Sequence, residues 1–302
     1  MDRIEQYRVF VQVAELGSFI QAARLLKLPR ATVSAAIQQL EANAGTRLLH
    51  RTTRKVSLTT DGSQLLQRAR QVLVEIDEID QLFHTHQEQV MGRLEIDVPS
   101  RIARRLLIPA LPEFFQRYPR LQLGLGSTDR SIDLVQEGVD CVIRFGTPQN
   151  SSLVVKPLGQ VLLINCASPA YLAEFGVPTE LAELQERHVC VGYAAGSGGQ
   201  EAQWEYCLDG VRQSLPLPSR LVVNNAESYI AACCTGLGLI QVPLFDVQHL
   251  LDSGELVEVL AAYRPPSMTV SVLYPDRRQR SRRLGAFIEW FAGLMAPYLQ
   301  SR

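Results

Sequence analysis

The chain has 302 residues, of which 46% are hydrophobic and 20% charged, and its formal net charge is −1. At roughly 100–200 residues per domain, this length predicts two or three folded domains, and the composition excludes a disordered chain. No run of about 18 apolar residues occurs, so no helical membrane span is expected, and the charged start MDRIEQYRVF is unlike a secretory signal. The six cysteines include no C-x-x-C pair. We therefore expect neither a disulfide framework nor a zinc site, and a reducing cytoplasm as the compartment.

The near-zero net charge conceals a basic segment near the N-terminus. Residues 24–55 carry seven basic residues and one acid, Glu41, whereas residues 61–88 carry six acids and two arginines. A compact positive patch in an otherwise neutral chain is typical of a nucleic-acid-binding module. A solvated charged surface is the alternative, and charge alone does not decide between the two.

Three short helices are predicted in the first 45 residues. Apolar residues at helical spacing predict a first helix that ends at Gly17, and Ser18 is a favourable N-cap for a second, shorter helix that breaks before Pro29. A third helix follows and ends at Gly45. Its buried stripe is predicted to consist of Val33, Ile37 and Leu40.

The second and third helices have the spacing of a helix-turn-helix. Ala23 is small enough for the helices to cross closely, and Val33, ten residues later, fills the space between them. Many DNA-binding examples have glycine four residues after this alanine, where this chain has Lys27. The third helix would lie in the major groove, where an arginine at its start can read guanine. The side chains expected to face the DNA are Arg30, Ala31, Thr32, Ser34, Ala35 and Gln38.

A hairpin with a basic tip is predicted next. The segment RLLHRTTRKVSLTT, residues 47–60, alternates enough for two short strands. Basic residues at such a tip would contact phosphate, which positions a protein on DNA without specifying sequence. An ordinary solvated hairpin tip is the alternative. The tip residues are Arg51, Thr52, Thr53, Arg54 and Lys55.

Residues 61–90 predict a long helix with a heptad seam. The segment has no proline, and its one glycine, Gly62, lies in the first turn. A lone helix cannot bury such a stripe, so we expect it to pair with its own copy in a homodimer. Packing against the body of the same chain is the alternative. The seam consists of Leu65, Ala69, Val72, Ile76, Ile79, Phe83, His86 and Val90.

After Met91, short apolar runs alternate with helical segments to the end of the chain. The runs LEIDV, LQLGL, DCVIRF and VLLINC, with ARRLLIPALPEFFQRYP and DRSIDLVQEG between the first three, predict an α/β unit with a largely parallel sheet. Further strands are expected at HVCVGY, SRLVVN, GLGLIQV and MTVSVLY, and an amphipathic helix at 282–299. The region is long enough for two lobes.

The first 62 residues resemble the N-terminal domain of LysR-type transcriptional regulators, through GSFIQAARLL, ATVSAAIQQLE and TRLLHRTTRKVSLTTDG. The later GLGLIQVP, the chain length and the domain order extend this resemblance to the whole chain. It implies a winged helix-turn-helix at 1–60, a linker helix for dimerisation at 61–90 and an effector-binding domain at 91–302. This domain would have two α/β lobes like those of periplasmic solute-binding proteins. Lobe I would comprise 93–162 and 268–302, and lobe II 163–267.

The resemblance implies a cytoplasmic, sequence-specific regulator of transcription. It would bind a pseudo-palindromic site on double-stranded DNA as a homodimer through the linker helix, or as a homotetramer, and a small-molecule effector between the lobes would switch it. No metal and no cofactor is implied. Much of the family has arginine where this chain has Ala35. Base reading is therefore expected to depend on Arg30, Thr32, Ser34 and the hairpin tip.

Polar residues at strand ends and helix starts are the candidates for the effector site. In two-lobed folds a ligand lies between the lobes, near helix N-termini whose backbone N–H groups attract anions. Ser100 follows LEIDV, and Thr128 and Asp129 follow LQLGL, each before a helical segment. A helix cap without a ligand is the alternative for each candidate. The expected effector residues are Ser100, Thr128, Arg144, Phe145, Asn224 and Asn225.

Two further classes of function are alternatives to the regulator. No G-x-S-x-G, Walker loop, H-E-x-x-H or strand-borne G-x-G-x-x-G occurs, so we do not expect an enzyme. A regulator of the same architecture that senses redox state through Cys190 and Cys207 is the other alternative. No neighbouring residue is a clear activator of either thiolate, and buried, inert cysteine is the usual case.

Overall fold

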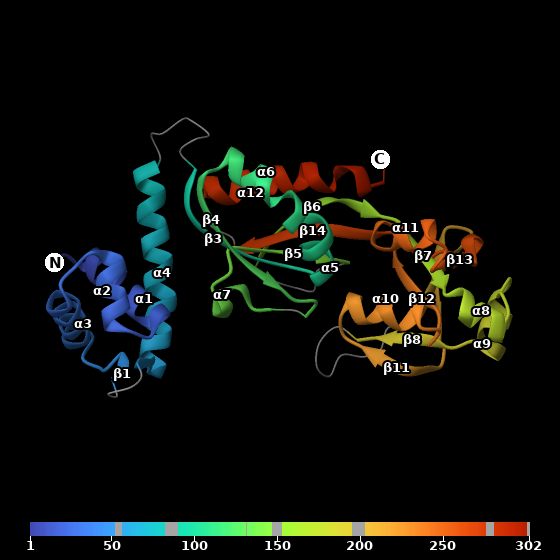
Figure 1. The fold of residues 1–302 in the computed structure, drawn as a ribbon, viewed down its shortest axis with the longest axis horizontal. Helices are drawn as coiled ribbons and strands as arrows, with labels where there is room; N and C mark the ends of the chain where they lie inside the picture. The colour runs from blue at the N-terminus through green and yellow to red at the C-terminus, as the bar shows by residue number, and fades with distance from the viewer. Residues whose placement is uncertain are drawn as a thin grey trace. The chain divides into compact units, whose positions relative to one another are not determined.

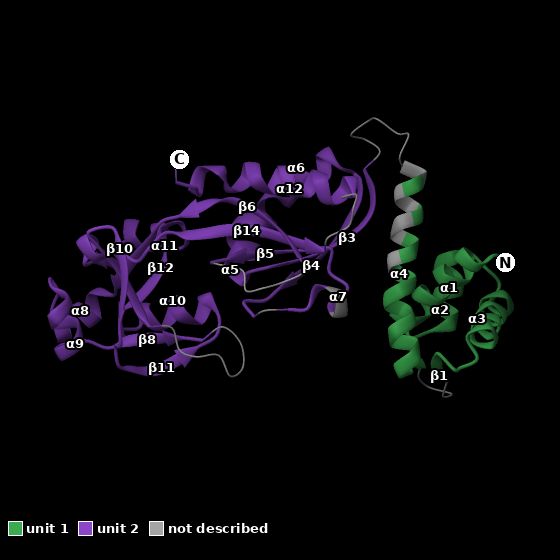
Figure 2. Ribbon diagram, turned by 180° about the vertical axis from the view of Figure 1, so that it is seen from behind, with its two compact units in different colours: residues 1–86 green, residues 87–302 purple. Residues whose placement is uncertain are grey.

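The computed structural model of the chain divides into two compact units, residues 1–86 and 87–302 (Figure 2). No helix in the part that it describes is both long and apolar enough to cross a membrane. The residues that it describes are 1–51, 56–81, 90–130, 132–146, 153–194, 203–275 and 281–300.

The first unit consists of three short helices, a hairpin and a long helix (Figure 1). The two hairpin strands are antiparallel, and the long helix packs along the first helix. The elements are α1 (Arg3–Leu16), α2 (Phe19–Leu26), α3 (Arg30–Ala44), β1 (Leu49–Arg51), β2 (Val56–Leu58) and α4 (Thr60–Gln81).

Local signals place the helix ends of this unit as predicted. Gly17 ends α1 with a φ of 58°, and the Ser18 hydroxyl accepts a hydrogen bond from the backbone N–H of Gln21 at the start of α2. Lys27 ends α2 with a φ of 53°, a left-handed conformation that favours glycine. The predicted stripe of α3 is confirmed, because Val33, Ile37 and Leu40 are at most 1% exposed.

The start of the long helix packs on its own chain, whereas the prediction was that the whole seam pairs with a second copy. Ala69, only 1% exposed, lies in the hydrophobic core of the first unit with Leu65 against it, while Val72 and Ile79 are 38% and 60% exposed. The start of the seam thus packs on its own chain, since α1 offers it an apolar face. Placing Val90 on the seam was wrong, because it lies in the core of the second unit, just before a strand. Ile76 is half-buried, and the seam residues Phe83 and His86 lie outside the described residues.

The second unit has two lobes built on separate sheets (Figure 1). The first lobe contains a five-stranded sheet, and α6 and α12 lie over one of its faces. Its elements are β3 (Met91–Val98), α5 (Ser100–Ile102), the π-helix η2 (Ala103–Leu107), α6 (Ile108–Arg117), β4 (Arg120–Ser127), α7 (Leu134–Glu137), β5 (Cys141–Phe145), β6 (Leu153–Val161), β14 (Met268–Pro275), α12 (Arg282–Met295) and η4 (Ala296–Tyr298).

The second lobe is the stretch of chain between β6 and β14. It holds a three-stranded sheet and two two-stranded sheets. Its elements are β7 (Leu163–Ala167), α8 (Pro169–Phe175), α9 (Leu181–Arg187), β8 (Cys190–Tyr193), β9 (Trp204–Leu208), β10 (Val211–Leu215), β11 (Ser219–Val223), α10 (Ala226–Cys234), β12 (Ile240–Pro243), α11 (Leu244–Asp252), β13 (Val257–Val259) and η3 (Ala261–Tyr263).

The sheets are mixed, so the expectation of a largely parallel sheet was wrong. In the five-stranded order β4-β3-β5-β14-β6, β3 is parallel to both its neighbours, whereas β14 is antiparallel to β5 and β6. The reason is that the chain returns from the second lobe into β14 in the opposite direction. In the second lobe β7 is antiparallel to β12 and β13, whereas β8 and β11 pair in parallel.

Three local predictions need correction. The run VLLINC is not one strand but the end of β6 and most of β7, divided at Leu162, and β6 begins as early as Leu153. In the described part of the segment DRSIDLVQEG, the helix is limited to the short α7. The hairpin of β9 and β10 was missed, although its Asp209-Gly210 turn is a strong hairpin signal.

Candidate functional site

The outer face of α3 carries the six residues predicted to face DNA. Arg30, Ala31, Ala35 and Gln38 are exposed, and Thr32 and Ser34 are half-buried. The N-cap residue Pro29 gives no side-chain hydrogen bond to the first turn. Backbone N–H groups at the start of α3 therefore lack a side-chain cap and can donate to phosphate.

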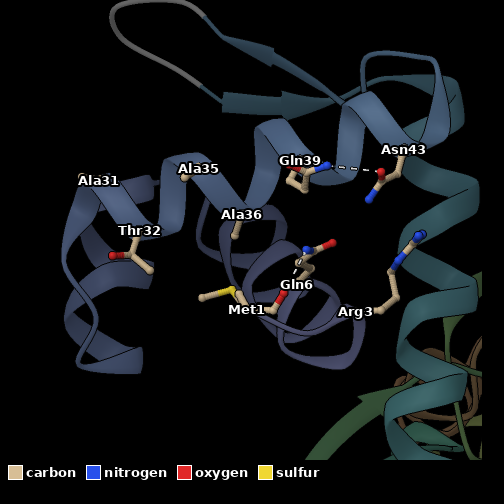
Figure 3. Close-up of a pocket in the computed structure, with 9 residues that line it drawn as sticks. All are labelled: Met1, Arg3, Gln6, Ala31, Thr32, Ala35, Ala36, Gln39 and Asn43. Carbon is tan, nitrogen blue, oxygen red and sulfur yellow. Dashed lines mark hydrogen bonds between the residues drawn. The ribbon is translucent and has the colours of Figure 1, made fainter.

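A hollow of about 830 Å³ runs beside α3 (Figure 3). The Gln6 side chain forms part of its wall and is only 7% exposed; its Nε2 donates to the carbonyl of Met1 at 3.3 Å. Its Oε1 has no hydrogen-bond partner within the described part of the chain. Sequence reasoning missed this side, because Gln6 stands between Glu5 and Tyr7-Arg8, where a polar residue is expected to be solvated. The lining residues are Met1, Arg3, Gln6, Ala31, Thr32, Ala35, Ala36, Gln39 and Asn43.

Glu41 is the one acid in the basic segment, and it links α3 to the hairpin. Its Oε1 accepts the backbone N–H groups of Leu48 and Leu49 at 3.0 and 3.2 Å. Its charge thus stabilises the start of β1. Of the predicted tip residues, Thr52, Thr53, Arg54 and Lys55 lie outside the described residues, and Arg51 ends β1.

Ser100 and Thr128 lie together at one edge of the five-stranded sheet, where β3 and β4 end. The parallel strands β3 and β4 are in register, with Val98 opposite Ser127, so both strands end side by side. The backbone N–H of Thr128 donates to the carbonyl of Val98 at 3.2 Å, which fixes this edge.

A buried carboxylate holds Thr128 and Arg144 together. Asp97 is 2% exposed, and its Oδ1 accepts from Thr128 Oγ1 at 3.1 Å and from Arg144 Nη2 at 2.7 Å. The arginine compensates a charge that would be costly to bury alone. Sequence reasoning missed Asp97. The signal was a charged residue within the apolar strand LEIDV, together with the opposite charge of Arg144 near the carboxyl end of another strand.

The hydroxyl of Ser100 faces a second carboxylate, that of Asp129. Asp129 Oδ1 accepts the backbone N–H of Ser100 at 2.8 Å, and Oδ2 accepts its hydroxyl at 3.0 Å. Oδ2 also accepts the backbone N–H of Ala226, the first residue of α10 in the second lobe, at 2.7 Å. Burial, and then the charge of Asp129, raise the pKa of Tyr193 to about 12. Asp129 therefore joins the two lobes.

The other expected effector residues lie on both lobes. Asn225 caps α10, since its Oδ1 accepts the backbone N–H of Ser228 at 2.8 Å, and its Nδ2 donates to Asn224 at 3.2 Å. Phe145 at the end of β5 stacks on Phe245 of α11, with ring centroids 6.3 Å apart. Asn225 thus acts as a helix cap, which was the alternative to a role in effector binding.

A charged cluster also crosses between the lobes. Arg101, 5% exposed, donates to Glu227 Oε2 at 2.9 Å and to the backbone carbonyl of Asp246, and Arg105 contacts His249 Nε2 at 2.8 Å. Burial raises the pKa of Asp246 to about 7 although Arg101 opposes the shift. In the sequence Arg101 and Arg105, four residues apart, have the spacing of a solvated helix face, so this contact was not predicted.

The cysteines do not favour the redox alternative. Cys190 is buried in β8 and Cys207 half-buried in β9, and these strands belong to different sheets. Burial raises the pKa of Cys141, and hydrogen bonding to Cys166 and burial raise that of Cys233. Such thiols form little of the reactive thiolate at neutral pH. Among the described side chains, no group of three His, Cys, Asp or Glu could hold a metal ion.

Comparison with protein-family models gives two matches. Residues 4–63 match the model described as "Bacterial regulatory helix-turn-helix protein, lysR family". Residues 87–296 match the "LysR substrate binding domain".

Relatives are similar over nearly the whole chain. YhjC, an uncharacterized HTH-type transcriptional regulator of Escherichia coli (strain K12), is 42% identical over 299 residues, which cover 99% of this chain and 100% of the relative. An HTH-type transcriptional repressor of Pseudomonas aeruginosa is 34% identical, covering 98% of this chain and 93% of its own. Among solved structures, CrgA of Neisseria meningitidis, a LysR-type transcriptional regulator, is 30% identical with a TM-score of 0.60, covering 96% and 97% of the two chains.

Proposed function

Because this chain belongs to the LysR family of transcriptional regulators, we propose that it recognises one operator sequence through α3 and the basic hairpin, and that a small molecule bound between its two lobes switches this activity. We propose a regulator without enzymatic activity of its own, working in the cytoplasm. No cofactor is needed for these roles.

The exposed face of α3 is the observation that supports operator recognition most directly. Its buried stripe turns Arg30, Thr32, Ser34 and Gln38 outward, next to a hairpin whose base Glu41 fixes. The guanidinium of Arg30 can bind the O6 and N7 atoms of a guanine, while the hairpin tip and the uncapped start of α3 contact phosphate.

Replacing Arg30 tests this assignment. An operator is first selected from random duplexes with the wild-type protein. On that operator Arg30→Ala is expected to bind about 1–3 kcal/mol more weakly, the cost of one lost bidentate base contact, with little change on unrelated DNA. Arg54→Ala, the phosphate control, should weaken binding to both DNAs and reduce the salt dependence. Unchanged operator affinity of Arg30→Ala, measured by fluorescence anisotropy, would contradict the proposal.

We propose a homodimer through α4, and a homotetramer of two such dimers. The support is that Val72 and Ile79 are 38% and 60% exposed in the single chain, although both lie on the heptad seam. A two-fold protein reads a two-fold site, so the operator should be pseudo-palindromic. The double variant Val72→Asp/Ile79→Asp should sediment as a smaller species while its circular dichroism stays that of the wild type. An unchanged mass would place the interface elsewhere.

For the effector we propose the junction of the lobes, around Ser100, Thr128, Arg144 and Phe145 of the first lobe and the two asparagines before α10. Both hydroxyls lie at the edge of the sheet that meets the second lobe, and Asp129 connects the Ser100 hydroxyl to α10. A change in this junction would alter how the lobes meet. An effector can shift the balance between two lobe arrangements only if it binds one of them more tightly than the other.

A thermal-shift screen of metabolites, followed by Ser100→Ala and Thr128→Ala, tests the effector site. Each variant should keep the operator affinity of the effector-free protein and lose most of the response to the effector in a footprinting assay. A double variant that responds at the wild-type effector concentration would place the site elsewhere. Loss of operator binding in the absence of effector would show that both residues are only structural.

A further inference from the structure

Donors from both lobes converge on the carboxylate of Asp129. Ser100 offers its backbone N–H at 2.8 Å and its hydroxyl at 3.0 and 3.2 Å to the two oxygens, and Ala226 offers its backbone N–H at 2.7 Å. Within the described residues no cationic side chain forms an ion pair with Asp129. The negative charge is therefore held by neutral donors, one of which is the positive start of the nine-residue helix α10.

These donors are those that a bound carboxylate would use. A free carboxylate in a protein site is held by backbone N–H groups and hydroxyls that point to one place. Here the chain itself supplies the carboxylate, attached to the loop after β4, and it satisfies the Ser100 hydroxyl and both N–H groups. The hydroxyl of Thr128 beside it is directed to Asp97 at 3.1 Å.

An ordinary loop-fixing aspartate is the alternative reading of Asp129. Such a residue bonds within its own lobe, as Asp140 does when it accepts the backbone N–H of Glu95 in β3 at 2.9 Å. Asp129 instead reaches Ala226, 97 residues away in the other lobe. Its contacts thus bear on how the lobes meet, which is where the effector is proposed to act.

We propose that Asp129 is a built-in carboxylate ligand that fills the anion position at the lobe junction, so that the wild-type site accepts an effector presenting a neutral or positively charged group and excludes free carboxylates. A second carboxylate beside Asp129 would be repelled, and it would find its donors already engaged. This inference rests on the proposed effector site and names the chemical class that the site takes.

Removing the carboxylate and supplying a free one tests this directly. Asp129→Ala leaves the donors of Ser100 and Ala226 without an acceptor and opens space for a small anion. The thermal midpoint of unfolding of the full chain is measured in sodium acetate and sodium formate against sodium chloride of equal ionic strength. Tryptophan fluorescence is the readout, because both tryptophans, Trp204 and Trp290, lie in the second unit.

The expected result is a saturable rise of the Asp129→Ala midpoint in acetate or formate, by about 3 °C when the anion is at ten times its dissociation constant. The wild type and Asp129→Asn, whose amide fills the same space, should show the same midpoint in acetate as in chloride. If Asp129→Ala is unfolded in chloride, acetate or formate should restore its native tryptophan emission on refolding from urea.

Two results would overturn the proposal. One is an Asp129→Ala protein that neither carboxylate stabilises or refolds beyond the effect of chloride. The other is a wild type that acetate stabilises as strongly as the variant, which would mean that the anion position is open. Rescue is measured without DNA, so a failed rescue does not bear on the proposals of operator recognition and dimerisation. A successful rescue, combined with a metabolite screen that finds no effector, would count against the proposed switch alone.

Discussion

Neutralising Asp246 should make the second unit less sensitive to pH. Asp246 lies on α11 and is 6% exposed; burial raises its pKa from 3.8 to about 7, although Arg101 and Arg105 lower it, and Glu227 raises it slightly. The folded protein therefore holds a proton that the unfolded chain releases near pH 3.8. The stabilisation is complete below the unfolded pKa and is lost as the pH rises through the folded one.

The size of the effect follows from this shift. One pKa unit corresponds to about 1.4 kcal/mol, so the free energy of unfolding should fall by about 4 kcal/mol in all as the pH rises through both pKa values. From about pH 5 to about pH 8 the loss is about 3 kcal/mol. In Asp246→Asn the titrating group is gone, and this part of the pH dependence should disappear.

Urea unfolding followed by tryptophan fluorescence measures this in the second unit. From about pH 5 to about pH 8, the unfolding free energy of the wild type should fall by about 3 kcal/mol relative to that of Asp246→Asn. The control is Asp252→Asn, an exposed aspartate on the same helix, whose curve should stay parallel to that of the wild type. A parallel curve for Asp246→Asn as well would refute the reasoning, because it would show that Asp246 is ionised in the folded protein throughout.

Two further predictions concern the backbone. Lys27→Gly should stabilise the first unit by about 1 kcal/mol, measured by urea unfolding and far-UV circular dichroism, because Lys27 has a φ of 53°; a loss of stability would contradict this. Gly62→Ala should destabilise the same unit by about 1–3 kcal/mol, since the added Cβ would lie 1.9 Å from the carbonyl oxygen of Leu48. Gly293→Ala, in a helix with nothing within 4 Å of the new Cβ, is the control and should raise the stability of the second unit by about 0.5–1 kcal/mol.

The first unit could be predicted well because its signals are local. Gly17, Ser18 and Gly45 each act within one turn of a helix end, and Val33 and Ile37 repeat at the spacing of one helix face. The partner of α4 could not be predicted in this way. A heptad pattern states that a stripe is to be buried, and gives no information on whether the same chain or a second copy buries it.

The second unit shows where local reasoning ends. β6 contains Pro157 and Gly159, which weaken a strand pattern, and it forms because β14 pairs with it from more than 100 residues away. The sequence pattern placed Ser100 and Thr128 each just after a strand, and the register of β3 and β4 brings these two strand ends side by side. It could not show that Asp129 would reach Ala226, because that contact depends on how two separately folded lobes meet.

The connections between the lobes leave the first lobe at one place. Val161 at the end of β6 lies opposite Met268 at the start of β14, and all of the second lobe is inserted between them. Such a module can be exchanged for that of a relative through two junctions that lie next to each other in space, with the five-stranded sheet left intact. Ligand preference can therefore diverge in this lineage by recombination as well as by point substitution, while the DNA-facing unit keeps its own sequence.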